Sequence, residues 1–279
     1  MPLERILITV KTYPTLSAKY GELVCTAGLR EDGSWIRIYP VPFRQLEAYQ
    51  KFHKYSFIEA EVIRNTRDAR PESHKVSTDT LNLTGELLST YDDWRERRQW
   101  ILNRGTVHTN LTHLIEANKQ GILSIATFKP SKIIDFKAEP DIPDWGVEKL
   151  AAVDALAKQG DLFSGWKGTD LAALIRKLPW KFSYTIEDDA GRRSTMMIED
   201  WEIGELYWNC LKTSRSPTEA VEKVRQKYLA EFATKDLYLY LGTTKKYDRW
   251  ASNPFVIIGV FYPPRQRQGL LDFGEGAAD

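Results

Sequence analysis

Hydrophobic and polar residues alternate over short segments in the first half of the chain, a pattern typical of half-buried β-strands. We predict strands at residues 5–13, 22–29, 34–39, 55–65, 122–128 and 132–137. Asp32-Gly33 predicts a tight hairpin turn, because glycine adopts positive φ angles without steric cost. A short helix is expected at residues 43–52. Short strands separated by turns and a helix favour an OB-like barrel, with a small sheet as the alternative.

Helical periodicity is stronger further along the chain. Apolar residues recur every three or four positions in segments that predict helices at residues 90–104, 109–120, 147–158, 202–212 and 218–234. Strands are expected at residues 179–187, 193–199, 236–241 and 254–262, with a hairpin turn at 188–191. Asp200 and Ser216 are predicted N-caps, because their side chains accept hydrogen bonds from the first backbone N–H groups of a helix. The predicted fold class is α+β.

Changes in composition divide the chain into four parts. Residues 1–138 are predicted to form the β-rich, OB-like domain with inserted helices, and residues 139–178 a connecting helix and linker. Residues 179–264 are predicted to form an α+β domain. Residues 265–279 are a polar tail that we expect to be mobile.

Composition narrows the class of protein without identifying it. Of the 279 residues, 42% are hydrophobic and 28% are charged, as expected of a globular protein with a substantial core. Lys and Arg number 39 against 38 Asp and Glu, so contact with nucleic acid would need a local basic patch. Cys25 and Cys210 lie among apolar residues and are expected to be reduced, buried thiols. No apolar run reaches the roughly 20 residues of a membrane span, and no secretory segment is visible, so we expect a cytoplasmic protein with no membrane partner.

Three basic and aromatic features predict contact with DNA or RNA through stacking on bases and pairing with phosphates. They are one face of the strand at residues 34–39, the loop at residues 64–75, and the segment at residues 245–250. The predicted nucleic-acid-binding residues are Trp35, Arg37, Tyr39, Arg64, Arg67, Arg70, Lys75, Lys245, Lys246, Arg249 and Trp250. The alternative for each feature is an ordinary solvated surface.

An acidic strand-to-helix junction at residues 199–202 carries the densest set of candidate metal ligands. Asp200 and Glu202 share one side of an extended chain, as a Mg²⁺ site for phosphodiester hydrolysis requires. Lys181 on the adjacent strand, or Arg193, is the candidate that stabilises charge. The alternative needs no cofactor: Asp200 caps the following helix, and Glu202 interacts favourably with the dipole of its first turn. We favour capping over catalysis.

Two short segments resemble the peptides by which bacterial DNA-metabolism proteins bind the sliding clamp. The tail places Gln268, Leu271 and Phe273 in a Q-x-x-L-x-F pattern, and residues 159–163 fit a shorter version of the motif. Glutamine would contact the rim of a pocket that leucine and phenylalanine fill. The alternative is that both segments pack against the protein itself.

Longer stretches of the chain resemble two prokaryotic families. Residues 24–40 resemble proteins described as carrying two OB-type domains, and this resemblance implies oligonucleotide binding by analogy of fold alone. Residues 178–184, 198–202 and 255–264 resemble a family of bacterial and archaeal proteins. Members of that family carry a Cys/His cluster before the acidic junction, whereas residues 188–194 of this chain contain neither Cys nor His. This difference argues against a zinc site.

The sequence therefore favours a nucleic-acid-binding accessory protein of DNA maintenance or of defence against mobile elements, tethered to a clamp by its tail. A Mg²⁺-dependent nuclease centred on Asp200 and Glu202 is the first alternative, and a protein-interaction scaffold is the second. The sequence leaves open whether the protein is an enzyme.

Overall fold

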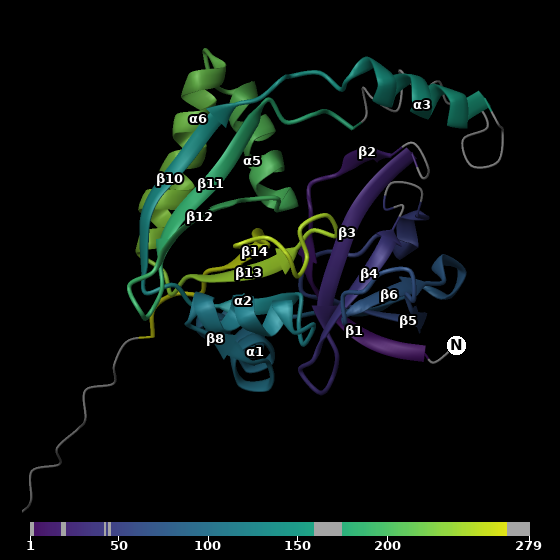
Figure 1. Ribbon diagram of the computed structural model, residues 1–279, viewed down its shortest axis with the longest axis horizontal. Coiled ribbons are helices and arrows are strands. Elements are labelled where there is room, and N and C mark those ends of the chain that lie inside the picture. The colour runs from purple at the N-terminus through teal and green to yellow at the C-terminus, as the bar shows by residue number, and fades with distance from the viewer. Residues whose placement is uncertain (1–2, 18–20, 42, 44–45, 159–174, 267–279) are drawn as a thin grey trace, which may run out of the picture.

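Five strands of the N-terminal half close into a small β-barrel. The barrel lies on the right of the molecule in Figure 1. The computed structural model describes residues 3–17, 21–41, 43, 46–158 and 175–266. The barrel strands are β1 (Leu3–Lys11), β3 (Gly21–Leu29), β4 (Trp35–Val41), β5 (Ser56–Arg64) and β6 (Ser73–Val76). They follow the order β1-β3-β4-β6-β5, and a second pairing of β1 with β5 closes the barrel. The β4–β6 pair is parallel and the other pairs are antiparallel, so the barrel is mixed and OB-like, as predicted.

Residues of the barrel strands alternate between two buried layers. The barrel interior is filled by aliphatic side chains, including Ile6, Ile8, Ile36, Ile38, Ile58 and Val62. The opposite face of the strands presents Leu7, Leu29 and Phe57, which share a core with Tyr240 and Phe261 of the C-terminal half. Two short strands extend the sheet: β2 (Thr15–Ser17) pairs with β3, and β7 (Asn82–Leu87) pairs with β5. One outer face of the barrel is therefore an internal interface.

Two local predictions for the barrel have opposite outcomes. The Asp32-Gly33 turn is confirmed, because Gly33 has a φ of +82° and a Cβ there would lie 2.1 Å from a backbone oxygen. The helix predicted at residues 43–52 is wrong, since the described residues there contain no α-helix and are 3₁₀-helical only at residue 43 and in η2 (Ala48–Gln50). Leu46 and Phe52 insert into the barrel core. These tertiary contacts outweigh the weak helical preference of a ten-residue segment.

Two sheets and several helices form the C-terminal half. The first sheet consists of β10 (Lys132–Pro140), β11 (Trp180–Glu187) and β12 (Arg193–Met197), in that order. The second has the order β14 (Phe255–Phe261), β13 (Tyr238–Thr243), β9 (Ile125–Phe128) and β8 (Val107–His108). The helices are α1 (Tyr91–Arg98) continued by the π-helical turn η4 (Gln99–Arg104), α2 (Leu111–Lys119), α3 (Val147–Lys158), α5 (Trp201–Lys212), and α6 (Pro217–Arg225) continued by η5 (Gln226–Glu231). The predicted α+β class is confirmed.

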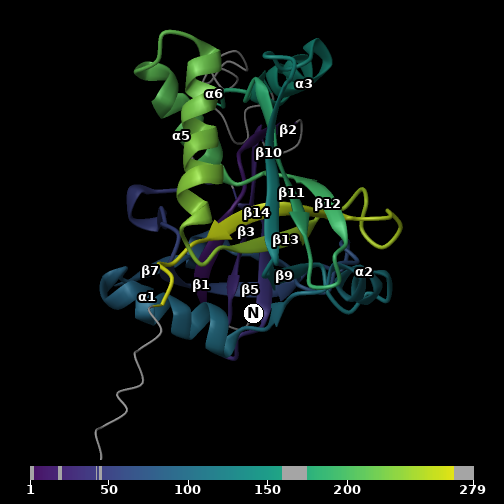
Figure 2. The same ribbon diagram turned by 90° about the vertical axis from the view of Figure 1, so that its left-hand side faces the viewer.

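Helices α5 and α6 cover one face of the β10–β12 sheet (Figures 1 and 2). Their buried residues, such as Tyr207 and Val224, share a core with Phe136 and Phe182 of the sheet. The predicted caps are confirmed: the Asp200 side chain accepts a hydrogen bond from the second N–H of α5, and the Ser216 side chain accepts one from the N–H of the third residue of α6. Within the described residues, no helix combines the length and apolar character needed to span a bilayer.

The end of β1 joins the barrel to the acidic junction. The backbone N–H of Tyr13 donates to the carbonyl oxygen of Glu199 at 2.8 Å, and the N–H of Glu199 donates to Ile257 of β14 at 2.7 Å. The Tyr13 ring lies directly against Gly204 of α5, and its hydroxyl accepts a hydrogen bond from the Trp208 indole at 2.8 Å. The junction therefore connects a barrel strand, a C-terminal sheet and a helix.

The strands predicted at residues 122–128 and 132–137 pair with C-terminal strands rather than with the barrel. In the structure they are β9, which pairs with β13, and β10, which pairs with β11. A boundary near residue 138 would divide both sheets, because each contains strands from either side of that position.

Candidate nucleic-acid interface

The strand face that carries Trp35, Arg37 and Tyr39 is covered by the C-terminal half. The Trp35 ring packs edge-on against Tyr240, with ring centroids 5.5 Å apart. Arg37 is 3% exposed, and its guanidinium donates to the Ser124 hydroxyl at 2.8 Å. Tyr39 is half-buried. In this arrangement Trp35 and Arg37 join the two halves of the protein; Arg37 is buried and Trp35 is partly buried.

The loop at residues 65–72, between β5 and β6, holds the second contact between the halves. Arg70 donates to both carboxylate oxygens of Asp68, from Nε at 3.0 Å and from Nη2 at 2.7 Å. Its Nη1 donates to the carbonyl oxygen of Thr243, at the end of β13, at 2.7 Å. Burial alone would raise the pKa of Asp68, but hydrogen bonds from Arg70 and Ser73 outweigh burial and hold the pKa well below its usual range.

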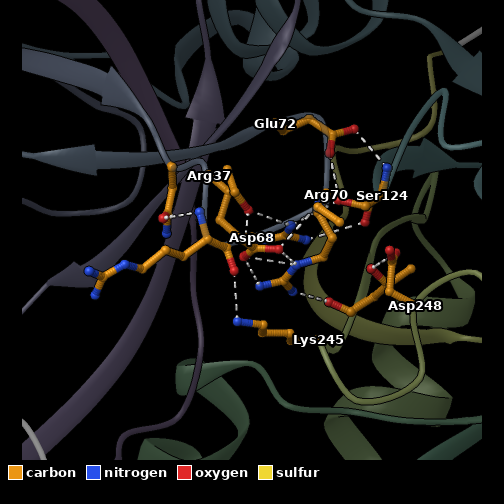
Figure 3. A network of polar contacts seen from close by, with 12 residues as sticks. Arg37, Asp68, Arg70, Glu72, Ser124, Lys245 and Asp248 are labelled. Atoms are coloured by element: carbon orange, nitrogen blue, oxygen red, sulfur yellow. Dashed lines mark hydrogen bonds and ion pairs between the residues drawn. The ribbon is translucent and has the colours of Figure 1, made fainter.

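Glu72, Ser124 and Arg37 form the other arm of this polar network (Figure 3). The Glu72 carboxylate accepts hydrogen bonds from the backbone N–H of Ser124 at 2.7 Å and from its hydroxyl at 2.5 Å. Arg37 donates to serine oxygens and, among the described residues, forms no ion pair. Burial and the neighbouring charge of Arg70 lower the pKa of Arg37 to about 10. Both buried arginines therefore serve the contact between the halves.

The remaining basic side chains of the two loops meet on one exposed surface. Lys245 donates from Nζ to the carbonyl oxygen of Arg67 at 2.9 Å, and the Arg249 guanidinium donates to the carbonyl oxygen of Ala69. The ring centroids of Tyr247 and Trp250 lie 5.5 Å apart in the same loop. We call this the basic-aromatic surface, and it consists of Arg67, Lys245, Lys246, Tyr247, Arg249 and Trp250.

The aromatic residues of the basic-aromatic surface face solvent. Trp250 is 66% exposed and Tyr247 is 42% exposed, which is unusual for large aromatic side chains. Figure 2 shows the loop between β13 and β14 projecting from the molecule on the same side as α2, whereas α1 lies on the other side. Arg64 and Lys75 are also exposed, and they flank the loop at residues 65–72 on strands β5 and β6.

The β13–β14 loop has a fixed anchor on α2. Asn118, near the end of α2, donates to the Asp248 carboxylate at 2.8 Å and accepts a hydrogen bond from the backbone N–H of Arg249 at 3.0 Å. The Thr243 hydroxyl also donates to Asp248, at 2.8 Å. Arg249 has a φ of +68°, a conformation that non-glycine residues keep only when their surroundings impose it. The loop is therefore anchored at its centre while its basic and aromatic side chains stay exposed.

At the acidic junction, a lysine occupies the position between the two candidate metal ligands. Asp200 is fully buried, and the Lys54 ammonium lies 3.4 Å from its carboxylate and 2.8 Å from that of Glu202. Burial alone would lower the pKa of Lys54, but the charges of Asp200 and Glu202 outweigh it and raise the pKa. Burial raises the pKa of Asp200, and the Lys54 charge opposes that shift.

Lys181 does not complete this group. Its ammonium lies 3.2 Å from the carboxylate of Asp141, and its backbone pairs with Glu139 of β10. Among the described residues, no group of three or more His, Cys, Asp or Glu side chains is arranged to hold a metal ion. The two cysteines, Cys25 and Cys210, are free thiols. The clamp-like segments at residues 159–163 and 268–273, with Gln268, Leu271 and Phe273, lie outside the described residues.

Sequence reasoning missed the residues that hold the interface together. Ser124 and Asn118 have no charge or motif that marks them, and Lys54 lies 146 residues from its partner Asp200. Asp68 and Glu72 did carry a signal, because acidic residues beside arginines in a basic loop indicate local pairing. That signal would have separated Arg70, which is paired with Asp68, from Arg67, which is exposed.

Residues 105–274 match the family described as a domain of unknown function, DUF8757. The chain belongs to this family. Residues 2–103 match a second domain of unknown function, DUF8758, so the two matches meet at the end of η4. No curated protein matches the chain in sequence. A solved structure described as a murine DNA binding protein bound with double-stranded DNA aligns over 96% of this chain and 98% of that one, with 9% identity and a TM-score of 0.31. A similarity this low carries no argument about fold or function.

Proposed function

We propose that the protein binds single-stranded DNA or RNA on the basic-aromatic surface. The observation that carries this proposal is the convergence of two loops that are distant in sequence, joined by the Lys245–Arg67 and Arg249–Ala69 hydrogen bonds. One of them connects the last two strands of an OB-like barrel, and the corresponding loop contacts oligonucleotides in OB-fold proteins. Two of the three features that the sequence singled out thus contribute to one surface.

The chemistry of the surface suits an unpaired strand. Exposed aromatic rings stack on bases of any sequence, and this contact requires bases that are not already stacked in a duplex. Trp250 and Tyr247 provide the rings, while the four basic residues Arg67, Lys245, Lys246 and Arg249 provide charges for the phosphates. The anchored loop lowers the entropy lost on binding, because the backbone is ordered beforehand.

The charge of the surface sets the expected salt dependence. Each basic side chain that pairs with a phosphate releases condensed counterions, and the logarithm of the affinity falls with the logarithm of the salt concentration. If all four basic residues engage phosphates, we expect a slope of about −3 for a single strand. A fluorescein-labelled 12-mer, titrated by fluorescence anisotropy in KCl from about 50 to 200 mM, measures this slope. Affinities that depend on phosphate contacts fall strongly over this range of salt concentration.

The decisive variant is Trp250→Ala, which removes one stacking platform and leaves every charge in place. Stacking of one base contributes roughly 1–3 kcal/mol, so we expect the affinity to fall by a factor of roughly 5 to 150. Tyr91→Ala is the matched control, because Tyr91 is an 85% exposed aromatic residue at the start of α1. Equal affinities for wild type and Trp250→Ala, or the absence of salt-dependent binding, would refute the proposal.

The rival hypotheses have less support. A Mg²⁺-dependent nuclease at Asp200 and Glu202 would need a cation where the Lys54 ammonium lies. A role in DNA maintenance or in defence against mobile elements stays a prediction, as does clamp tethering through Gln268, Leu271 and Phe273. A protein-interaction scaffold would show partners without any affinity for oligonucleotides, so the same titration separates that hypothesis from ours.

A further inference from the structure

A cavity of about 170 Å³ lies between the outer face of strands β3 and β4 and the C-terminal half. Ala27 and Arg37 line it from the barrel, and Glu199, Thr244 and Val256 line it from the opposite side. Lys245 of the basic-aromatic surface also borders the cavity, and it is exposed. The cavity therefore adjoins the surface on which we propose that a strand binds.

Two polar groups that line the cavity, the Thr244 hydroxyl and the Glu199 carboxylate, lack partners among the described residues. The Thr244 hydroxyl is buried and has no hydrogen-bond partner, although most buried hydroxyls have one. The Glu199 carboxylate makes no hydrogen bond or ion pair with any described residue, and burial raises its pKa. Arg37 donates from Nη1 and Nη2 to Ser73 and Ser124, but among the described residues its Nε has no acceptor and its guanidinium forms no ion pair. A carboxylate, a hydroxyl and a guanidinium around one small space can serve a ligand that presents both donors and acceptors.

The size and the apolar part of the cavity restrict that ligand further. A cavity of about 150 Å³ holds one benzene ring, so this one accommodates a single six-membered heterocycle with small substituents. Val10, Val256 and Ile258 supply apolar surface for the faces of such a ring. A purine, with its second ring, fits less well. Of the parts of a nucleic acid, a pyrimidine base matches both the volume and the mixed polarity.

We propose that this cavity takes one unstacked pyrimidine base of the bound strand and reads its Watson–Crick edge through Glu199 and Arg37. The inference rests on the proposed function, because the base belongs to a strand held at the basic-aromatic surface, which meets the cavity at Lys245. Glu199 accepts a hydrogen bond from the exocyclic amino group of cytosine, while Arg37 donates to the carbonyl oxygen and ring nitrogen. Thymine and uracil present an oxygen where cytosine has its amino group, so the cavity favours cytosine.

Binding of dC12 and dT12 oligonucleotides, compared at pH 7.5 in the same salt, tests the base preference. One bidentate base contact discriminates by roughly 1–3 kcal/mol, so we expect dC12 to bind on the order of tenfold more tightly than dT12. Glu199→Gln should reduce this ratio to near one by weakening dC12. Glu139→Gln is the matched control, because Glu139 is exposed on β10 and makes no ion pair among the described residues; the ratio should stay as in wild type.

A second variant and a chemical probe guard against a folding defect. Val256→Phe fills the cavity with an apolar side chain and should abolish the preference for dC12, with circular dichroism confirming the fold. Saturating dC12 should also protect the Cys25 thiol, which lines the cavity, from N-ethylmaleimide, while Cys210 reacts as before. Equal, salt-dependent binding of dC12 and dT12 would overturn the base pocket and leave the proposed function intact. Failure of every oligonucleotide to bind would overturn both.

Discussion

The contact between Arg70 and Asp68 offers the sharpest test of how the two halves are held together. Replacing Arg70 by Met removes three hydrogen bonds to the Asp68 carboxylate and one to the carbonyl oxygen of Thr243. Both Arg70 and Asp68 are about 95% buried, so the substitution leaves a carboxylate in a poorly solvated site without its counterion. Breaking a buried ion pair in this way costs about 3–5 kcal/mol.

Thermal unfolding followed by circular dichroism measures the loss. A change of 1 kcal/mol shifts the Tm of a domain of 150–250 residues by roughly 2–4 °C, so we expect Arg70→Met to lower the Tm by about 12 °C. Arg95→Met is the matched control, because Arg95 forms an ion pair with Asp92 on the exposed surface of α1. Exposed pairs of this kind contribute at most about 1 kcal/mol, so the control should lower the Tm by a few degrees at most.

A second substitution distinguishes the buried charge from simple loss of packing. The double variant Asp68→Asn with Arg70→Met removes the stranded carboxylate, so it should be more stable than Arg70→Met alone. An Arg70→Met variant no less stable than Arg95→Met would refute the view that this network joins the halves.

The network also implies a pH dependence with a definite sign. The pKa of Asp68 is lower in the folded protein than its usual value of 3.8, because the Arg70 and Ser73 hydrogen bonds outweigh the effect of burial. A lowered pKa stabilises the fold above the unfolded-state pKa, and this stabilisation is lost as the pH falls below it. Wild type should therefore lose stability as the pH is lowered from about 5 towards 2, and Asp68→Asn should lack this part of the loss.

Two further predictions concern the acidic junction. Gly204→Ala would place a Cβ 2.2 Å from the Tyr13 ring, and chemical denaturation should show a loss of about 1–3 kcal/mol through overpacking. Gly146→Ala is the control: no atom lies within 4 Å of its new Cβ, so it should be neutral in the same assay. Asp200→Asn keeps an N-cap acceptor but leaves Lys54 with one carboxylate, so it should lower the Tm. Wild type should show no Mg²⁺-dependent cleavage of labelled DNA. Metal-dependent cleavage that Asp200→Asn abolishes at an unchanged Tm would support the nuclease instead.

The local pattern of the sequence predicted most elements because each depends on its own residues. Alternation located the barrel strands, and cap residues such as Asp200 and Ser216 located two helix starts. The segment at residues 43–52 failed because its apolar residues are fixed by the barrel core and not by a helical stripe. Strand partners were also beyond reach, since β9 and β10 follow the barrel in the chain but pair with strands far beyond them.

The candidate site was only partly predictable for the same reason. Arg37 and Arg67 lie in segments that read alike, with basic and aromatic or polar residues interleaved. Their burial differs because Ser124, 87 residues later in the chain, lies against the Arg37 guanidinium, whereas Arg67 stays exposed. A charge pattern indicates where a basic surface is available, but tertiary pairing decides which of its side chains remain exposed. Lys54 is the opposite case: it forms ion pairs with Asp200 and Glu202, although no local sequence pattern indicates a role for that lysine.

The covered barrel face changes what an OB-like fold implies for this protein. In OB-fold proteins the second and third barrel strands carry the oligonucleotide, and here the corresponding strands, β3 and β4, face the C-terminal half. A continuous strand therefore cannot lie across them while the Arg37–Ser124 and Arg70–Thr243 hydrogen bonds hold. What remains of that face is a cavity large enough for one base, bordered by a loop that carries exposed charges and rings. On the proposed function, the C-terminal half replaces an extended binding face by a single pocket beside the basic-aromatic surface, and recognition of a strand requires both halves together.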